Sequence, residues 1–555
     1  MDKLLIKNGS IFDPLNDIEG EIKDILIEGG KIVEKFSNQT DIKEIDAKNK
    51  TVVPSAIDIH THITSQQVDW IRLLGSKNKK FQELWEGMNL NFIAREFISK
   101  GYTFLVEANV FPSLAKQTIF NFKSLPVLDK AALLNISNLW PLELEFQRGS
   151  EEEACEFLSD LLFLTKSYGF KIYNPFEAES WNFQRLRENL KIKGRLYNFS
   201  PLDVYKNCTK YNEFLGLPHS VHAHIEGYEQ NQGKENLTSV LKDITSLNLE
   251  TSPQNNLNIN RSQLFHIAHA SSYNLDGDNT ELIEVLNKNQ KFDLDLAFLG
   301  FDRINPLITC DRRLINSLIS HENPYQLIRA AVESEGDSYA TFRNFDKNDR
   351  LYCNFWANAL DLALNINNKW QMQFTINFPN YAHIKNVAQI STWLMSEKAR
   401  LTYMKDMNKE FLKDNSLQNN HKELTFNEYV ILTRSSPAKS FGIGSIKGNL
   451  GTKADGDLNI LNINLEEIDL SKDYKEIEKA LENIEYVIKQ GNVIKKGDLI
   501  DLKQEGRIFW TRGNFKSGKT TNLLSKKKEF YQKYYSIFYE TLQSKISNNI
   551  QMEIV

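Results

Sequence analysis

Histidine pairs at short spacing are the residues of this chain that point most directly to chemistry. They are His60 and His62 in HTH, His222 and His224 in HAH, and His266 and His269 in HIAH. Each pair lies in a short apolar segment with strand character, and residues two apart in a strand face the same way. A lone histidine is more often a hydrogen-bonded core residue than a ligand, but several pairs at strand ends predict a metal site.

Lys171 is a second unusual residue, because it lies inside the apolar strand segment GFKIYNP. An unpaired ammonium group inside a barrel is costly. The lysine can pair with an acid, lose its proton through a lowered pKa, or react to a carbamate, which is anionic and can bridge two metal ions. The alternative is a side chain that reaches the barrel mouth and keeps its ammonium group in water.

Strand and helix patterns alternate over residues 54–440. Two clear helical patterns, with apolar residues at i, i+3 and i+4, cover residues 84–101 and 154–169. The alternation predicts a (β/α)8 barrel, whose active site is built at the C-terminal ends of the strands. The expected strand segments are SAIDIHTHI, YTFLVEAN, KAALLNIS, GFKIYNP, HSVHAHI, LFHIAHAS, FDLDLAFL and WQMQFTINF.

Both ends of the chain have the texture of short β-strands. Asn8-Gly9 and Gly29-Gly30 interrupt the apolar runs LLIKNGSIFD and DILIEGGKIVEKF, and such pairs favour tight β-turns. GDLNILNINL and IEYVIKQGNVIKKGDLI look similar. We therefore predict an α/β protein with a small β-sandwich domain built from both termini. The expected units are residues 1–53 and 441–510 for that domain, 54–440 for the barrel and 511–555 for a basic, aromatic helical tail.

Composition excludes several classes of protein. The 555 residues include 67 Lys and Arg against 72 Asp and Glu, so the net charge is −5, which disfavours nucleic-acid binding. No run approaches the ~18 apolar residues of a membrane span, and the N-terminus lacks the apolar core of a signal peptide. The four cysteines form no CxxC pair and suit a reducing compartment. We therefore predict a cytoplasmic protein that spans no membrane.

The order of these motifs resembles the amidohydrolase superfamily, in which HxH, Lys, His, His and an acid follow barrel strands one, four, five, six and eight. PSAIDIHTHI, VHAH and IAHASS resemble its first-, fifth- and sixth-strand motifs. A narrower resemblance is to the family that contains the A subunit of formylmethanofuran dehydrogenase and the hydrolase subunit of the formyltransferase/hydrolase complex. It is carried by IKNGSIFDPLNDIEGEIKDILIEGGKIVE, GFKIYNP, GLPHSVHAHIEG, INFPN, ISTWLMSEKAR and KYYSIFY.

This resemblance implies hydrolysis of the N-formyl amide of a formylated furan-type one-carbon carrier, giving formate and free carrier inside a multi-subunit complex of one of those two kinds. It also implies one or two Zn²⁺ ions, which lower the pKa of bound water from ~15.7 to ~7. An N6-carboxylysine at Lys171 would bridge two ions. The implied metal ligands are His60, His62, Lys171, His222 (rather than His224) and His269 (rather than His266).

Asn377 departs from the family pattern. The family's eighth-strand motif reads TDHPN, whereas this chain has INFPN, so Asn377 takes the place of the catalytic aspartate. An amide cannot shuttle a proton, and loss of a general acid or base typically costs ~10²–10⁴ in rate. His224 or His266 is the candidate to move the proton instead. The alternative function is a catalytically impaired scaffold subunit, and an amidohydrolase acting on a cyclic amide fits the narrower resemblance less well.

Residues 513–520, GNFKSGKT, match the GxxxxGK[ST] phosphate-binding pattern. Such a loop needs a strand before it, a helix after it and a parallel sheet. RIFW can supply the strand, but we expect no sheet from the 35 residues after Thr520, and hence no ATP binding. Those residues predict one helix, KKKEFYQKYYSIFYETLQSKI, with Phe530, Tyr534 and Phe538 on a face that packs against the barrel or a partner subunit.

Overall fold

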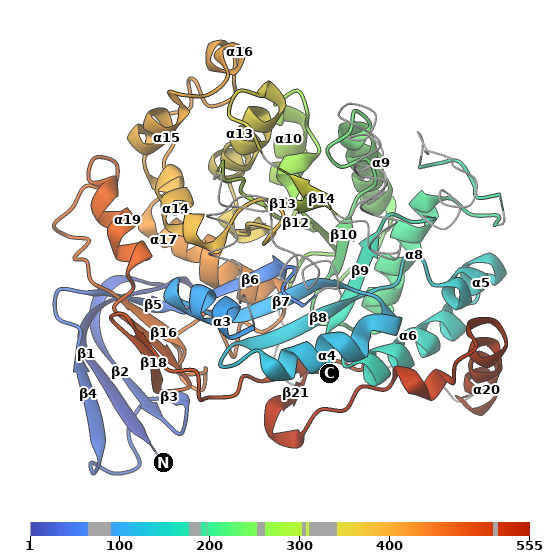
Figure 1. The fold of residues 1–555 in the computed structure, drawn as a ribbon, viewed down its shortest axis with the longest axis horizontal. Helices are drawn as coiled ribbons and strands as arrows, with labels where there is room; N and C mark the ends of the chain where they lie inside the picture. The colour runs from blue at the N-terminus through green and yellow to red at the C-terminus, as the bar shows by residue number, and fades with distance from the viewer. Residues whose placement is uncertain are drawn as a thin grey trace.

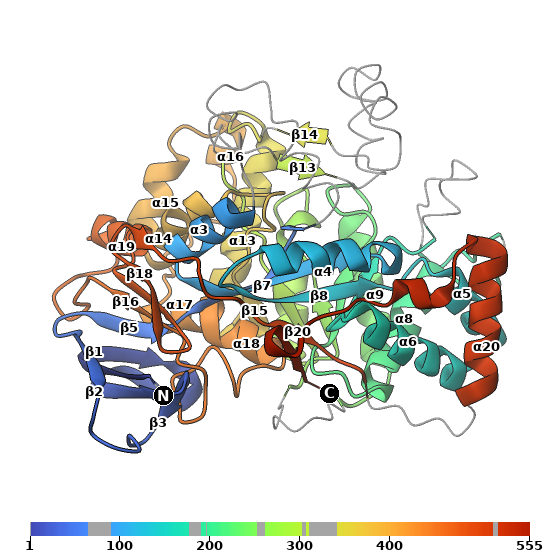
Figure 2. The same cartoon turned by 60° about the horizontal axis from the view of Figure 1, so that its bottom comes forward.

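A parallel β-barrel wrapped by helices forms the centre of the computed structural model (Figures 1 and 2), and a small β-domain lies beside it. The structure describes residues 2–64, 90–176, 190–195, 197–251, 261–301, 307–309, 341–343, 345–513 and 520–554. Within these residues, no helix has both the length and the apolar character needed to cross a membrane.

Each of the eight segments predicted as barrel strands contributes one parallel strand to the wall. A bridge between Thr61 and Phe378, with a 2.7 Å hydrogen bond from His62 N to Phe378 O, brings the end of the sheet back to its beginning. The predicted (β/α)8 barrel is therefore confirmed. The strands, in spatial order, are β6 (Ala56–Thr61), β7 (Tyr102–Val110), β8 (Asp129–Asn135), β9 (Gly169–Tyr173), β10 (Val221–His224), β11 (Phe265–Ile267), β12 (Phe292–Asp295) and β15 (Met372–Gln373).

Helices cover the outside of the barrel, so its strands are buried on both faces and read as nearly continuous apolar runs. The two clear helical patterns are α3 and α6; residues 84–89 of the first pattern lie outside the described residues. The helices are α3 (Leu90–Ser99), α4 (Ala115–Ser124), α5 (Trp140–Arg148), α6 (Glu151–Thr165), α8 (Pro201–Phe214), α9 (Gly233–Ser246), α10 (Thr280–Lys288), α13 (Arg350–Asn365), α14 (Val387–Met395), α15 (Glu397–Met404), α16 (Lys409–Lys413), α17 (Phe426–Val430), α18 (Ser436–Ser440), α19 (Tyr474–Glu482) and α20 (Thr520–Phe530).

Both termini build the small domain, as predicted. Strand β1 pairs with β2 on one side and with β4 and β5 on the other, and β16 from the C-terminal part pairs with β5. The strands form one curled sheet, in which Ile32 exchanges hydrogen bonds with Ala454 and Lys453. They are β1 (Lys3–Asp13), β2 (Ile18–Glu28), β3 (Lys31–Val33), β4 (Ile42–Asp46), β5 (Thr51–Pro54), β16 (Leu458–Leu461), β17 (Tyr486–Lys489), β18 (Asn492–Lys496) and β19 (Leu499–Ile500).

Only one of the two predicted β-turns is a turn. Gly29 and Gly30 have φ values of 61° and 82° and connect β2 to β3. Asn8 has φ 60°, but it lies at a register shift inside the continuous strand β1, so this pair forms a β-bulge. A Cβ on Gly9 would lie 2.6 Å from Val52 Cγ2, so close packing against β5 also requires glycine there.

The C-terminal tail joins the barrel sheet. Strand β20 (Ile508–Trp510) pairs in parallel with β8 and with β21 (Gln551–Glu553), although residues up to 510 were expected in the small domain. The expectation that no parallel sheet accompanies this segment is therefore wrong. Strand β9 begins only opposite Leu133, which leaves the start of β8 to pair with β20. Residues 514–519 of the phosphate-loop pattern lie outside the described residues, and the absence of ATP binding stays a prediction.

The aromatic face of the tail is shorter than predicted. Helix α20 continues as a wider turn to Tyr535 and ends at Ser536, which has φ 56°. Phe530 and Tyr534 pack against Trp140 of α5, each with ring centroids 5.0 Å apart. Phe538 follows the end of this helix and is 65% exposed. The prediction is thus confirmed for the first two aromatic residues and wrong for the third.

A buried cluster of charges joins the barrel to the C-terminal part of the small domain. Lys447 Nζ lies 2.8 Å from Asp129 of β8 and 3.1 Å from Asp455, and Arg507 contacts both carboxylates. Burial would raise the pKa of Asp455, but Lys447 and Arg507 bring it down to about 2. The cluster therefore holds ionised carboxylates that already have protein cations as partners.

Candidate metal centre

A narrow pocket opens at the C-terminal ends of the barrel strands. Its volume is about 40 Å³, enough for a few water-sized groups. It brings together six residues singled out from the sequence, whereas His222 and His266 are not among its lining residues. The pocket is lined by His60, His62, Asn109, Lys171, Tyr173, His224, Tyr228, His269, Asn377 and Asn380.

Both histidines of the HTH motif contact a carboxylate through Nδ1. His60 Nδ1 lies 2.8 Å from Asp295 Oδ2, and His62 Nδ1 lies 3.3 Å from Glu107 Oε1. Burial lowers the pKa of His60 to about 3, so its ring is neutral at neutral pH, as a metal ligand must be. A carboxylate on the far ring nitrogen is the usual partner of a metal-binding histidine, because it fixes the ring and its tautomer.

Asp295, at the end of β12, is a functional residue that the sequence analysis missed. Its Oδ1 accepts hydrogen bonds from His269 N (3.0 Å) and Thr375 Oγ1 (2.8 Å). Its Oδ2 faces His60 Nδ1 and His266 Nε2, the latter at 3.2 Å. Burial alone would raise the pKa of Asp295, but His60 and the hydrogen bond from His266 hold it well below its usual range. The carboxylate of β12 thus contacts side chains of β6, of β11 and of the segment after β15, beside the pocket.

His266 lies between two carboxylates rather than in the pocket. Its Nδ1 is 3.2 Å from Asp293 Oδ1, and its Nε2 is 3.2 Å from Asp295 Oδ2. Burial lowers its pKa, but the two carboxylates outweigh burial and raise the pKa to about 9. The alternation of Asp293 and Asp295 in FDLDLAF, with both acids on one face of a strand, was the sequence signal for this group.

His224 and His269 form the other half of the pocket. His224 Nδ1 and His269 Nε2 are 2.8 Å apart, and two nitrogen ligands of one tetrahedral zinc ion lie about 3.3 Å apart. His269 Nδ1 lies 3.0 Å from Ser272 Oγ, whose hydroxyl donates to His269 O. Ser272 therefore accepts the Nδ1 proton, and Nε2 of His269 keeps its lone pair for an ion.

Lys171 lies in the pocket wall, in the middle of β9. Its side chain is 1% exposed, and its Nζ makes no hydrogen bond within the described part of the chain. Burial lowers the pKa of Lys171 to about 7. A large share of the amine is therefore neutral at neutral pH, and the neutral amine is the form that reacts with CO₂ to give a carbamate. The lysine and the histidines around it fit a divalent metal site.

Asn377 lies at the pocket where the family has its aspartate. It has φ 43°, and its Oδ1 accepts a hydrogen bond from Asn380 Nδ2 (3.2 Å). The side chain therefore presents a neutral amide and brings no negative charge to the site.

A column of buried histidines runs from the pocket toward the bottom of the barrel. His60 Nδ1 lies 3.1 Å from His222 Nε2, and His222 Nδ1 lies 3.2 Å from His219 Nε2. His219 Nδ1 in turn lies 2.8 Å from the carbonyl oxygen of Ser440. Both ring nitrogens of His222 are thus engaged by other histidines, and His219 is a further residue that the sequence analysis did not single out.

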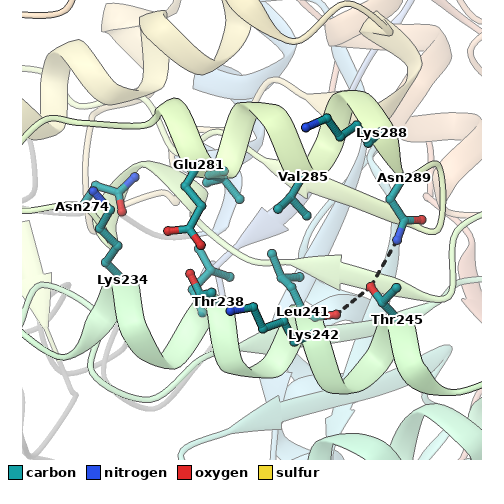
Figure 3. Close-up of a pocket in the computed structure, with 12 residues that line it drawn as sticks. Lys234, Thr238, Leu241, Lys242, Thr245, Asn274, Glu281, Val285, Lys288 and Asn289 are labelled. Atoms are coloured by element: carbon teal, nitrogen blue, oxygen red, sulfur yellow. Dashed lines mark hydrogen bonds between the residues drawn. The ribbon is translucent and has the colours of Figure 1, made fainter.

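A second, larger groove lies outside the barrel between α9 and α10 (Figure 3). Its volume is about 420 Å³, and its apolar floor includes Leu237, Leu241 and Val285. Asn289 Nδ2 donates to Thr245 Oγ1 at one end. No histidine or cysteine is among the described residues that line this groove, so it lacks the nitrogen donors that the barrel pocket could offer to a metal ion.

Comparisons with known proteins agree with this geometry. The profile described as "Amidohydrolase family" matches residues 336–495. Protein FwdA of Methanocaldococcus jannaschii is 28% identical over 549 residues, which cover 96% of this chain and 95% of that protein. The A subunit of the formyltransferase/hydrolase complex Fhc of Methylorubrum extorquens is 22% identical over 477 residues, covering 81% of this chain and 82% of the relative.

The fold also matches a solved structure over its full length. The crystal structure of the formyltransferase/hydrolase complex FhcABCD from Methylorubrum extorquens, in complex with methylofuran, contains a chain that superposes with a TM-score of 0.85. The match covers 99% of both chains at 19% sequence identity. The chain therefore has the amidohydrolase fold, and its predicted resemblance to the A subunits of formylmethanofuran dehydrogenase and of the formyltransferase/hydrolase complex is confirmed.

Proposed function

We propose that this protein is a metal-dependent hydrolase that cleaves the N-formyl amide of a formylated furan-type carrier to formate and free carrier. The observation that carries the proposal is the pocket itself, in which His60, His62, Lys171, His224 and His269 converge at the ends of barrel strands. Similarity to FwdA and to the Fhc A subunit over most of the chain supports the substrate class and work within a multi-subunit complex.

The proposed ligands are the two histidines of the HTH motif, His269, Lys171 as a carbamate, and one histidine of β10. His224 is the better candidate on β10, because it borders the pocket beside His269, whereas His222 is enclosed by His219 and His60. One or two Zn²⁺ ions suit these nitrogen donors. When bound, a divalent ion makes hydroxide available at neutral pH and polarises the formyl oxygen.

The protein's own residues would position the reacting groups. Asp295 holds the ring of His60 through a hydrogen bond, and the carboxylate of Glu107 lies beside the ring of His62, which favours preorganised ligands. Asn377 and Asn380 present amide groups to the pocket and can orient the formyl amide, but neither can exchange a proton. Among the described residues of the pocket, His224 is the histidine placed to exchange that proton when it does not bind an ion.

The first test is metal content, with His62→Ala as the perturbation and the exposed His421→Ala as its matched control. We expect about one Zn²⁺ per chain or more in the wild type and in the control, because three protein ligands suffice for a catalytic site. His62→Ala should lose metal and formate release together. A folded wild-type protein that takes up no divalent metal would refute the proposal. Crystallographic density of a branched extension on Lys171 between two metal positions would establish the carbamate, and a plain lysine would exclude it.

Asn377 favours a second candidate function, a scaffold subunit that keeps the fold without turnover. The missing carboxylate removes both a proton carrier and a negative charge from the site. Formate release from a formylated furan carrier, measured with the assembled complex and full metal occupancy, separates the two. Turnover that depends on the metal supports the hydrolase, and none supports the scaffold.

A further inference from the structure

His60 is the only histidine of the pocket whose Nδ1 faces two acceptors at once, among the contacts within the described residues. We infer that a buried relay, formed by the Ser440 carbonyl, His219 and His222 and joined by Asp295, fixes the proton of His60 on Nδ1 and reserves Nε2 for the metal. The inference rests on the proposed function, because it assigns positioning residues to the same site.

The relay begins at a group that can only accept a hydrogen bond. The carbonyl oxygen of Ser440 lies 2.8 Å from His219 Nδ1, so that nitrogen carries the proton and His219 Nε2 has the lone pair. His219 Nε2 lies 3.2 Å from His222 Nδ1, which must therefore donate. His222 Nε2 is then an acceptor as well, and it lies 3.1 Å from His60 Nδ1. The position of the proton on each ring thus fixes its position on the next ring, from His219 through His222 to His60.

Asp295 sets the same tautomer independently. Its Oδ1 accepts from the backbone N–H of His269, which can only donate, and from Thr375 Oγ1, so the carboxylate is held in one orientation. Its Oδ2 then faces His60 Nδ1 at 2.8 Å. Both partners of His60 Nδ1 are thus acceptors, and the ring is left with a bare Nε2.

His62, the other histidine of the HTH motif, also has a carboxylate beside its Nδ1. Glu107 accepts hydrogen bonds from Ile63 N and Thr64 N through Oε2, and its Oε1 faces His62 Nδ1. Each histidine of the HTH motif therefore has a carboxylate beside its Nδ1, one from β7 and one from β12. In this arrangement His222 is a positioning residue of His60 and not a metal ligand.

The direct test reads the tautomer without any variant. In metal-free protein labelled with ¹⁵N-histidine, the nitrogen chemical shifts of His60, assigned from the signals lost in His60→Ala, report which nitrogen carries the proton. We expect the proton on Nδ1. A proton on Nε2 would overturn the inference, whatever the protein's activity.

The second test uses Asp295→Asn. The amide oxygen of the asparagine must still accept from His269 N, so its NH₂ group turns toward His60 Nδ1. It then disfavours a proton on Nδ1, and among the described contacts His222 Nε2 is the one acceptor that remains for that proton. Zinc affinity, measured by chelator competition, should fall by about 10- to 100-fold, the usual effect of removing such a partner. Asp13→Asn is the control, because this buried carboxylate lies in the small domain and accepts hydrogen bonds from Asn16 and Leu450 rather than from a group of the relay. Its affinity should stay close to that of the wild type.

A double-mutant cycle separates positioning from general damage. In a His60→Ala background, Asp295→Asn should cause no further loss of zinc affinity, because its partner is already gone. An additive loss in the double variant, or unchanged affinity in Asp295→Asn, would overturn the inference and leave the proposed function intact. A wild-type protein that binds no metal would instead contradict the proposed function.

Discussion

Burial of Lys171 should lower the free energy of unfolding, and a substitution at this position can measure by how much. Its pKa falls from 10.5 to about 7, because burial disfavours the ammonium form. A tenfold change in a proton-binding constant corresponds to about 1.4 kcal/mol, so keeping this lysine in the barrel costs about 4 kcal/mol at pH 7. Lys171→Met keeps an unbranched, flexible side chain and removes the charge. The metal-free, CO₂-free variant should therefore be more stable than the wild type by up to about 4 kcal/mol at pH 7.

The sign of the pH dependence follows from proton binding. Between pH 7 and 10.5 the unfolded chain binds a proton at Lys171 that the folded chain has released, so wild-type stability rises with pH in this window. The advantage of Lys171→Met should shrink to about 2 kcal/mol at pH 9. Urea unfolding of both proteins at the two pH values measures the difference. Lys123→Met, which removes an exposed lysine of α4, is the control and should change stability by less than about 0.5 kcal/mol at either pH.

Two results would refute this reasoning. If the gap between the wild type and Lys171→Met is the same at pH 7 and pH 9, the lysine keeps its proton in the folded protein. If the variant is less stable than the wild type, the ammonium group has a partner that stabilises it. In either case Lys171 would not be poised to form a carbamate.

Three further predictions concern the site, the charge cluster and the tail. Asn377→Asp should raise formate release by about 10²-fold and tighten zinc binding, because it adds a proton carrier and a charge; equal rates at full occupancy would show that another residue moves the proton. Lys447→Met should lower the free energy of unfolding by about 3–5 kcal/mol, since it leaves the buried carboxylate of Asp457 without a cationic partner among the described contacts. In the wild type, the share of stability that comes from Asp455 should be lost as pH falls from about 4 to about 2, which acid-unfolding curves can follow. Trp140→Ala should expose the segment around Phe530 and Tyr534 to limited proteolysis, and an unchanged cleavage rate would show that this packing does not anchor the tail.

The sequence alone determined the barrel and indicated the type of chemistry to expect in it. Apolar runs alternating with helical patterns identify strands and helices through local periodicity, and each of the eight predicted segments became a barrel strand. The HTH motif and Lys171 could be singled out for the pocket because histidines at a strand end and a lysine inside an apolar strand are local features of the sequence. Asp293 and Asp295 could have been noticed in the same way, as two acids on one face of a predicted strand.

Only the tertiary structure decided that His224 rather than His222 lines the pocket. His222 and His224 share a face of β10, so their spacing cannot tell the deeper residue from the one at the mouth. That depth depends on the stagger of neighbouring strands around the barrel. The partner of His60 is 235 residues away in the chain, at Asp295. Strand β20 likewise pairs with the start of β8, because β9 pairs with β8 only from Leu133 onward. Such long-range pairings leave no local pattern, since they arise only when distant strands close into one barrel.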